Sequence, residues 1–324
     1  MLVPIPDGVC QFVPTNLISA IANYNDLCGE NPLWDIKTQR LYWTDMTGRR
    51  FYAYDWKSGK SEILEEDFEV CGAAFNEPAS GDAPGWVVVN SHGIWLWDGL
   101  ERLSLLTAEV DGERCQMDDC IADPQGRLFA GSWFYDPADD NYPLGHLIRV
   151  DADGSTRIVD DGIHLANGLG FSPDLKTLYF ADSAARVIRA YDYNVDSGGI
   201  RNRRDFVRVP PDSGLPDGLT VDAEGYVWCA HWFGVRVVRY DPDGNIERTI
   251  LFPAKQVSSI AFGGPEFTDI FVTSAGLSDS PPLAPMGYDP GAGYIGGSLF
   301  HTNLDIPGRP EYRARISIPR SLAG

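Results

Sequence analysis

The chain has 324 residues, a formal net charge of -20 and a sequence pI near 4.5. This acidic balance argues against a nucleic-acid partner, because binding phosphates requires a face on which Lys and Arg outnumber the acids. Hydrophobic residues make up 44%, with nine Trp, fourteen Tyr and fifteen Phe, which supports a packed core and excludes a disordered chain.

The first residues, residues 1–15, are predicted to form an extended, Pro-rich N-terminal arm, and residues 16–324 a single domain. No basic segment leads into a continuous apolar run, and no stretch is long and apolar enough to span a membrane. We therefore expect no secretory signal, no membrane partner and a cytoplasmic protein, either a monomer or a weak homo-oligomer. The six Cys include no Cys-x-x-Cys pair, so free thiols are expected.

Short apolar or alternating runs separated by turn-forming clusters recur along the chain and predict antiparallel meanders. The clearest copy spans residues 215–244, others begin at 119 and 167, and weaker copies begin at 32, 72 and 259. Successive copies start roughly 40 to 50 residues apart, which is the period of a four-stranded propeller blade. The sequence therefore predicts an all-β fold, a six-bladed β-propeller of four-stranded antiparallel blades.

Two features concern the ends and loops of this ring. The run 16–22 could supply the outer strand that closes it, with the C-terminal run 312–318 as its neighbour. The segment 136–145 is long enough to cover a pocket mouth, and the Gly- and Pro-rich segment 278–297 is too long for a simple hairpin. We expect the latter to be a lid or an ordered surface loop.

Oxygen-bearing side chains stand at the start of four predicted inner strands. Because these strands line the central channel, the residues just before them converge at one mouth; they are Glu30, Asp118 with Asp119, Asn167 and Asp217. Asn167-Gly168 and Asp217-Gly218 could instead be ordinary turn entries. Four such groups in phase favour a site for a hard cation such as Ca²⁺, Mg²⁺ or Mn²⁺.

Several motifs closely resemble those of the gluconolactonase family, which also includes regucalcin and the luciferin-regenerating enzymes. They occur in order and cover about residues 27–304; they include Cys28-Gly-Glu-Asn-Pro-Leu-Trp-Asp35, Arg40-Leu-Tyr-Trp-Thr-Asp45, Asn167-Gly-Leu-Gly-Phe-Ser-Pro-Asp174 and Pro216-Asp-Gly-Leu219. The resemblance implies a sugar lactonase with a six-bladed propeller and one divalent metal ion held by Glu30, Asn167 and Asp217. The identity of the ion, among Ca, Zn, Mg, Mn and Fe, is left open.

The segment expected to bind substrate departs from the family pattern. Many members have Arg-x-Asn-Asp-Gly where this chain has Gln116-Met-Asp-Asp-Cys120. Losing the Arg removes a strong hydrogen-bond donor, so we expect a different preferred lactone. Asp118 could add a carboxylate near the metal or accept hydrogen bonds from sugar hydroxyls.

Further groups are predicted at the same mouth as substrate contacts: Trp133, Asp136 and His231. His231 could act in catalysis, since histidine titrates near neutral pH, but the interpretation we favour is a hydrogen-bonding wall residue on a loop.

The chemistry expected at this mouth is metal-assisted hydrolysis. A cation would bind the lactone carbonyl oxygen while Asp217 removes a proton from the attacking water, and the ring would open to the aldonic acid. No Gly-x-Ser-x-Gly motif is present, which disfavours a serine nucleophile. Two alternatives stay open: a broader lactonase or esterase on the same metal site, and a non-catalytic calcium-binding regulatory propeller.

Overall fold

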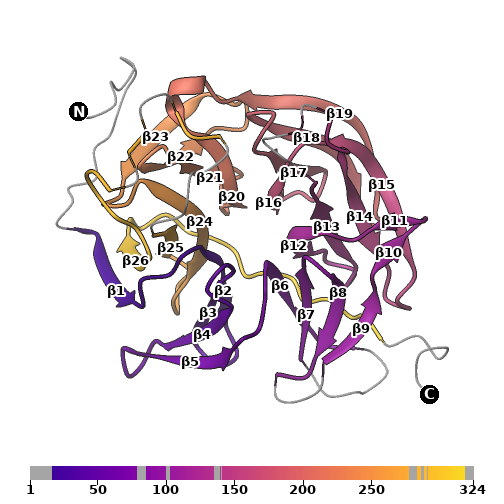
Figure 1. The fold of residues 1–324 in the computed structure, drawn as a ribbon, viewed down its shortest axis with the longest axis horizontal. Coiled ribbons are helices and arrows are strands. Elements are labelled where there is room, and N and C mark those ends of the chain that lie inside the picture. The colour runs from indigo at the N-terminus through magenta and orange to yellow at the C-terminus, as the bar shows by residue number, and fades with distance from the viewer. Residues whose placement is uncertain are drawn as a thin grey trace.

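Six four-stranded antiparallel sheets surround a central channel in a computed structural model (Figure 1). The structure describes residues 17–78, 85–99, 103–134, 139, 141–276, 283–285, 288–289 and 291–317. The prediction of an all-β, six-bladed propeller is confirmed.

In every blade the strand that begins the repeat lies innermost and the next strands follow outward. Blade 1 consists of β2 (Gly29–Asp35), β3 (Arg40–Asp45), β4 (Arg50–Asp55) and β5 (Lys60–Glu66). Blade 2 consists of β6 (Gly72–Asn76), β7 (Gly85–Asn90), β8 (Gly93–Trp97) and β9 (Leu103–Thr107). Blade 3 consists of β12 (Met117–Ala122), β13 (Leu128–Ser132), β14 (Gly145–Val150) and β15 (Thr156–Ile163).

The remaining blades follow the same order. Blade 4 consists of β16 (Ala166–Phe171), β17 (Thr177–Asp182), β18 (Val187–Asn194) and β19 (Gly199–Arg208). Blade 5 consists of β20 (Leu215–Val221), β21 (Val227–Trp232), β22 (Arg236–Tyr240) and β23 (Ile246–Leu251). Blade 6 combines β24 (Gln256–Gly263), β25 (Asp269–Ala275) and β26 (Ser298–Asn303) with β1 (Ser19–Asn23). A short hairpin, β10 (Glu109–Val110) and β11 (Glu113–Arg114), and the turn η2 (Pro211–Ser213) complete the described elements.

Burial falls from the centre of the ring to its rim. The innermost strand β6 is buried at every residue, whereas the outermost β5 exposes most of its side chains. Aromatic side chains fill the wedges between blades, as where Trp34 of blade 1 stacks on Phe271 of blade 6 with ring centroids 5.7 Å apart. Apolar contacts between neighbouring sheets therefore hold the ring together.

The N-terminal strand closes the ring, as the sequence predicted. β1 pairs with β26, so that Ser19 faces His301 and Asn23 faces Ser298. The expectation that the run 312–318 would be the neighbour of this strand is wrong. The C-terminal run crosses the channel instead and bridges Ala314 to Asn76 at the end of β6 (Figure 1, yellow).

We call residues 307–317 the C-terminal strap. It contacts the far end of the inner strand, or the turn that follows it, in every blade. These contacts join Arg313 to Asp35, Ala314 to Phe75 and Glu77, Arg315 to Gly126, Arg309 to Phe171, Pro307 to Ala223, and Gly308 to Phe267. The strap thus covers the end of the channel opposite the starts of the inner strands.

The turns after the inner strands explain the repeated Asp and Gly of the sequence. The buried Asp123 carboxylate accepts hydrogen bonds from the amides of Gln125 and Arg127, both at 2.9 Å, and Gly126 has φ +84°. Asp222 does the same in blade 5, where its carboxylate accepts from Glu224 and Tyr226. The left-handed backbone conformation costs least for Gly, so this turn favours Gly at that position.

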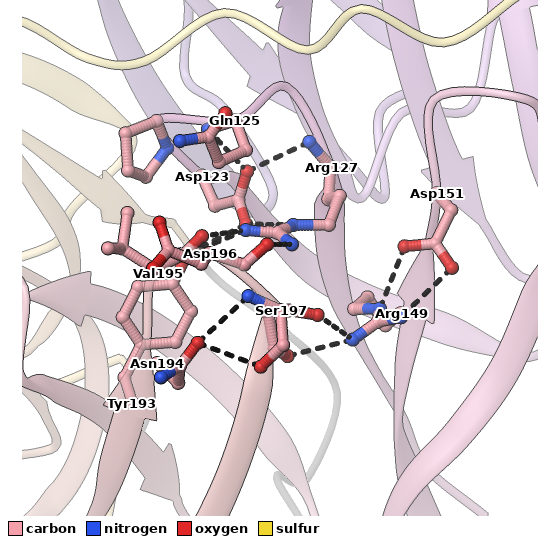
Figure 2. A network of polar contacts seen from close by, with 12 residues as sticks. Asp123, Gln125, Arg127, Arg149, Asp151, Tyr193, Asn194, Val195, Asp196 and Ser197 are labelled. Carbon is pink, nitrogen blue, oxygen red and sulfur yellow. Dashed lines mark hydrogen bonds and ion pairs between the residues drawn. The ribbon is translucent and has the colours of Figure 1, made fainter.

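The Asp123 turn also joins two blades (Figure 2). Its carboxylate pairs with Arg127, and Tyr193 of blade 4 donates a hydrogen bond to it at 2.8 Å. Arg127 and Arg149 of blade 3 donate to backbone carbonyls in the turn between β18 and β19, those of Val195, Asp196, Ser197 and Gly198. Because both arginines are buried and paired, we assign this network a structural role in joining blades 3 and 4.

Five of the six cysteines lie in the described residues, and all five are free and buried. This confirms the expected free thiols for those positions. Within the described ranges, no helix has the length and apolar character needed to cross a membrane.

Candidate functional site

The candidate site is built from an irregularity that recurs in the inner strands. Register shifts interrupt the pairing of five inner strands, between Glu30 and Leu33 and at the equivalent places in blades 3, 4, 5 and 6. The residues inside these β-bulges begin with Asn31, Asp118, Asn167, Asp217 and Ser258. β6 pairs without any shift. A bulge redirects a side chain, so Asp118, Asn167 and Asp217 are aimed by the same device, whereas Glu30 is the paired residue directly before its bulge.

The sequence placed these donors just before the inner strands, and the structure places them inside the strands. Glu30 is the second residue of β2, Asn167 the second of β16, and Asp217 the third of β20. The Asn-Gly and Asp-Gly pairs are therefore bulged strand residues and not turn entries.

A hydrogen bond within each bulge holds the donor side chain. The amide of Asn31 donates to the Glu30 carboxylate at 3.1 Å, and the amide of Gly168 donates to the Asn167 side-chain oxygen at 3.2 Å. The Gly218 amide makes the same kind of bond to the Asp217 carboxylate. Amides freed from strand pairing thus orient the site oxygens.

Close packing of neighbouring inner strands explains the glycines after Asn167 and Asp217. A Cβ on Gly168 would lie 2.1 Å from the Leu219 nitrogen, and one on Gly218 would lie 2.0 Å from the Ser259 Oγ. Each glycine therefore lets one blade approach the next at the depth of the site.

Residues on the second strand of each blade anchor the segment before the donor. Asp45 pairs with Gly29 in register, and its carboxylate accepts from the Cys28 amide at 2.9 Å. In blade 4, Asp182 pairs with Ala166 and accepts from the Leu165 amide at 3.1 Å. Both carboxylates are buried with no exposed surface. Sequence reasoning missed this role, although the recurrence of Asp45 and Asp182 at the ends of matching motifs was a signal for it.

His231 takes the same position in blade 5. It pairs with Pro216 in register and lies in β21, not in the turn that the sequence suggested. Its Nδ1 is 2.8 Å from the Ser213 carbonyl oxygen and its Nε2 is 3.0 Å from the Tyr240 hydroxyl. Burial lowers the pKa of His231 to about 4, so the ring is neutral at physiological pH.

The donors of the three predicted metal-binding positions face one cavity. Glu30, Asn167 and Asp217 line it together with Asp118 and Trp133, and its volume is about 370 Å³. This is within the usual range for small-molecule pockets, ~300–1,000 Å³. The structure thus brings together five of the eight predicted site residues.

The other three predicted residues are placed differently. Gln116 and His231 are not among the described residues that line the cavity. Asp136 lies outside the described residues. Direct contact of these three with substrate stays a prediction.

Burial and mutual repulsion disfavour the negative charges of the carboxylates at this cavity. Burial raises the pKa of Asp217 well above its usual range, and the nearby Glu30 and Asp118 raise it further. The pKa of Glu30 is raised in the same way, by burial and then by Asp119 and Asp118, and that of Asp118 is raised to about 8. Throughout the described part of the chain, no Lys, Arg or His forms an ion pair with these acids.

This donor set fits a hard divalent cation. Two carboxylates and an amide oxygen, buried without a protein counter-charge, are the ligand types that Ca²⁺, Mg²⁺ and Mn²⁺ prefer. In the ranges that the structure describes, no group of three or more His, Cys, Asp or Glu side chains is arranged to hold a metal. The fit therefore depends on two carboxylates together with the amide oxygen of Asn167.

Comparison with known proteins identifies the family. The family model described as "SMP-30/Gluconolactonase/LRE-like region" matches residues 28–276. Pentonolactonase XacC of Haloferax volcanii is 35% identical over 90% of this chain and 95% of its own, and regucalcin of Danio rerio is 33% identical over 88% and 93%.

A solved structure of a calcium-binding protein, regucalcin from Agrobacterium tumefaciens, superposes with a TM-score of 0.78 at 25% identity. The superposition covers 92% of this chain and 97% of that one. The family model covers more than half of the chain, and this chain belongs to the SMP-30/gluconolactonase/LRE-like family.

Proposed function

We propose that this protein hydrolyses a sugar-derived lactone to the aldonic acid with the help of one divalent cation. The observation that supports this most is the cavity, which Glu30, Asn167 and Asp217 line together and whose described lining includes no Lys or Arg. The family and the similarity to a pentonolactonase support the lactone as substrate.

In this proposal Glu30, Asn167 and Asp217 hold the cation. When bound, it supplies Lewis-acid polarisation of the lactone carbonyl. The bulge amides of Asn31 and Gly168 keep two of the three side chains in place. Asp118 and Trp133 face the same space and would contact the ring of the substrate.

Asp217 is proposed as the general base. Its carboxylate takes a proton from water while the water oxygen bonds to the carbonyl carbon. The proton then passes to the ring oxygen as the bond between that oxygen and the carbonyl carbon breaks, which leaves the hydroxy acid. The ionised form of the Asp217 carboxylate is the one that accepts the proton, and a bound cation would favour that form.

Replacing the proposed base tests this role. Asp217→Asn should lower kcat/KM for the best lactone by about 10²–10⁴-fold, because the amide cannot accept the proton. Asp212→Asn makes the same chemical change at an exposed position five residues earlier and should leave the rate unchanged. Full activity in folded Asp217→Asn, with the cation present, would refute the assignment.

A second function, calcium binding without turnover, is favoured by one observation. The superposed regucalcin is described as a calcium-binding protein, and the donor oxygens of this chain could hold Ca²⁺ without any turnover. Tight Ca²⁺ binding combined with no hydrolysis of any lactone would support this function over the enzyme.

A further inference from the structure

Apart from the oxygen donors, most of the described residues that line the cavity are apolar. This apolar wall is formed by Met46, Leu165, Leu215, Trp232, Phe233 and Leu283. These residues come from blades 1, 4 and 5 and from the segment between β25 and β26. The apolar wall therefore surrounds the site from several blades and is not one exposed side chain.

The aromatic part of this wall is held rigidly. Phe233 is 7% exposed and has φ +63°, a conformation that a bulky residue adopts only when its surroundings impose it. Its ring packs edge-on against Tyr288 with centroids 4.8 Å apart. His231, bonded through both ring nitrogens, anchors the start of this turn, and the Gly234 amide closes it on the His231 carbonyl at 2.8 Å.

The polar groups of the cavity are mainly hydrogen-bond acceptors with negative charge. Glu30, Asp118 and Asp217 are acids, and the Ser183 hydroxyl already donates to the Pro216 carbonyl at 2.6 Å. No Lys, Arg or His occurs among the described lining residues. With Glu30 and Asp217 ionised, a doubly charged cation would only neutralise them, so the described lining would offer no net positive charge.

From this arrangement we infer that the cavity selects neutral lactones that carry an apolar group, such as a deoxy or alkyl carbon, against this wall. The inference rests on the proposed lactonase function and specifies its substrate. A hydroxyl placed against the apolar wall would lose its water and find few hydrogen-bond partners among the described lining residues. A phosphate or sulfonate would find no counter-ion among the same residues.

The test compares six-carbon aldonolactones that differ only at the terminal carbon, which is a methyl, a hydroxymethyl or a phosphorylated hydroxymethyl group. With the cation present, kcat/KM should be about tenfold higher for the methyl than for the hydroxymethyl compound. It should be at least about a hundredfold lower for the phosphorylated compound than for the methyl compound.

A charge introduced into the wall gives an independent readout. Met46 lies partly exposed in the turn between β3 and β4, where a lysine of similar length can be accommodated. Met46→Lys should raise kcat/KM for the phosphorylated lactone by about tenfold, whereas the uncharged Met46→Gln should not.

The outcomes separate this inference from the proposed function. Hydrolysis of all three lactones at similar kcat/KM, or a preference for the hydroxymethyl or phosphorylated compound, would overturn the inference and leave the lactonase function standing. No hydrolysis of any lactone by the cation-loaded wild-type protein would overturn both.

Discussion

At the residue scale, one buried acid has no place in the proposed reaction. Glu311 of the C-terminal strap and Asp119 of β12 both line a small cavity of about 40 Å³ between the site and the strap. The pKa of Glu311 is raised to about 7, chiefly because the carboxyl is buried. Asp119 acts in the same direction and Arg309 in the opposite one. The surface that Glu311 exposes faces this enclosed space, so its charge is poorly solvated.

The raised pKa of Glu311 predicts a specific pH dependence of stability. An acid whose pKa is higher in the folded state contributes stability that is complete below its unfolded value, 4.5, and is lost as the pH rises through about 7. Glu311→Gln removes this titration. In urea unfolding, the variant should gain about 2–3 kcal/mol relative to wild type between about pH 4.5 and pH 8. A difference that is the same at both pH values would contradict the shift.

At the scale of single elements, the bulged inner strand is the feature that makes the site. The sequence located Glu30, Asn167 and Asp217, because oxygen-bearing residues recur at the same place in the repeat. It did not show the bulges, since the pattern of side chains does not specify at which residue the backbone pairing of two consecutive strands shifts. For the same reason, the anchoring role of His231 became visible only from its pairing with Pro216.

The close approach of neighbouring bulges can be tested at Gly168. Gly168→Ala would place a Cβ 2.1 Å from the Leu219 nitrogen and 2.8 Å from the Asp217 oxygen, both backbone atoms. We expect a loss of about 1–3 kcal/mol in the free energy of unfolding. We also expect a loss of about a hundredfold in kcat/KM, because the proposed base would be displaced.

The matched control is Gly291→Ala, where the nearest atom to the new Cβ is the Asp289 side chain at 3.5 Å. This change should alter stability by less than about 0.5 kcal/mol. Equal effects of the two substitutions would argue against the proposed packing constraint.

At the scale of the whole molecule, the ring is secured at two places. β1 supplies the last strand of blade 6, and the strap crosses the far end of the channel. The repeat predicted six blades and a closing N-terminal strand. The sequence did not predict the strap, because residues 307–317 contain almost no regular strand and therefore no strand pattern. Their partners come from all six blades, which are far apart in the sequence. We propose that residues 16–324 fold as one unit, with residues 1–15 as an arm.

Asn76 provides a test of the strap. Its buried side chain donates to the Ile316 carbonyl and accepts from the Ile316 amide, both at 2.9 Å. Asn76→Ala should lower the free energy of unfolding by about 1–3 kcal/mol, because two buried backbone groups lose their partner. The exposed Asn141→Ala should cost less than about 0.5 kcal/mol. Since Asn76 lies at the end of the channel away from the cavity, kcat should stay the same. An unchanged unfolding midpoint in Asn76→Ala would show that the strap adds little.

The central claim is that the buried acids at the channel mouth serve cation-dependent lactone hydrolysis. The most direct test measures initial acid release from neutral aldonolactones by metal-stripped protein, with Ca²⁺, Mg²⁺, Mn²⁺, Zn²⁺ or Fe²⁺ restored in turn. We expect hydrolysis well above the spontaneous rate only after a divalent cation is restored. Equal rates with and without cation would contradict the proposed mechanism, and tight cation binding without turnover of any lactone would contradict the enzymatic function.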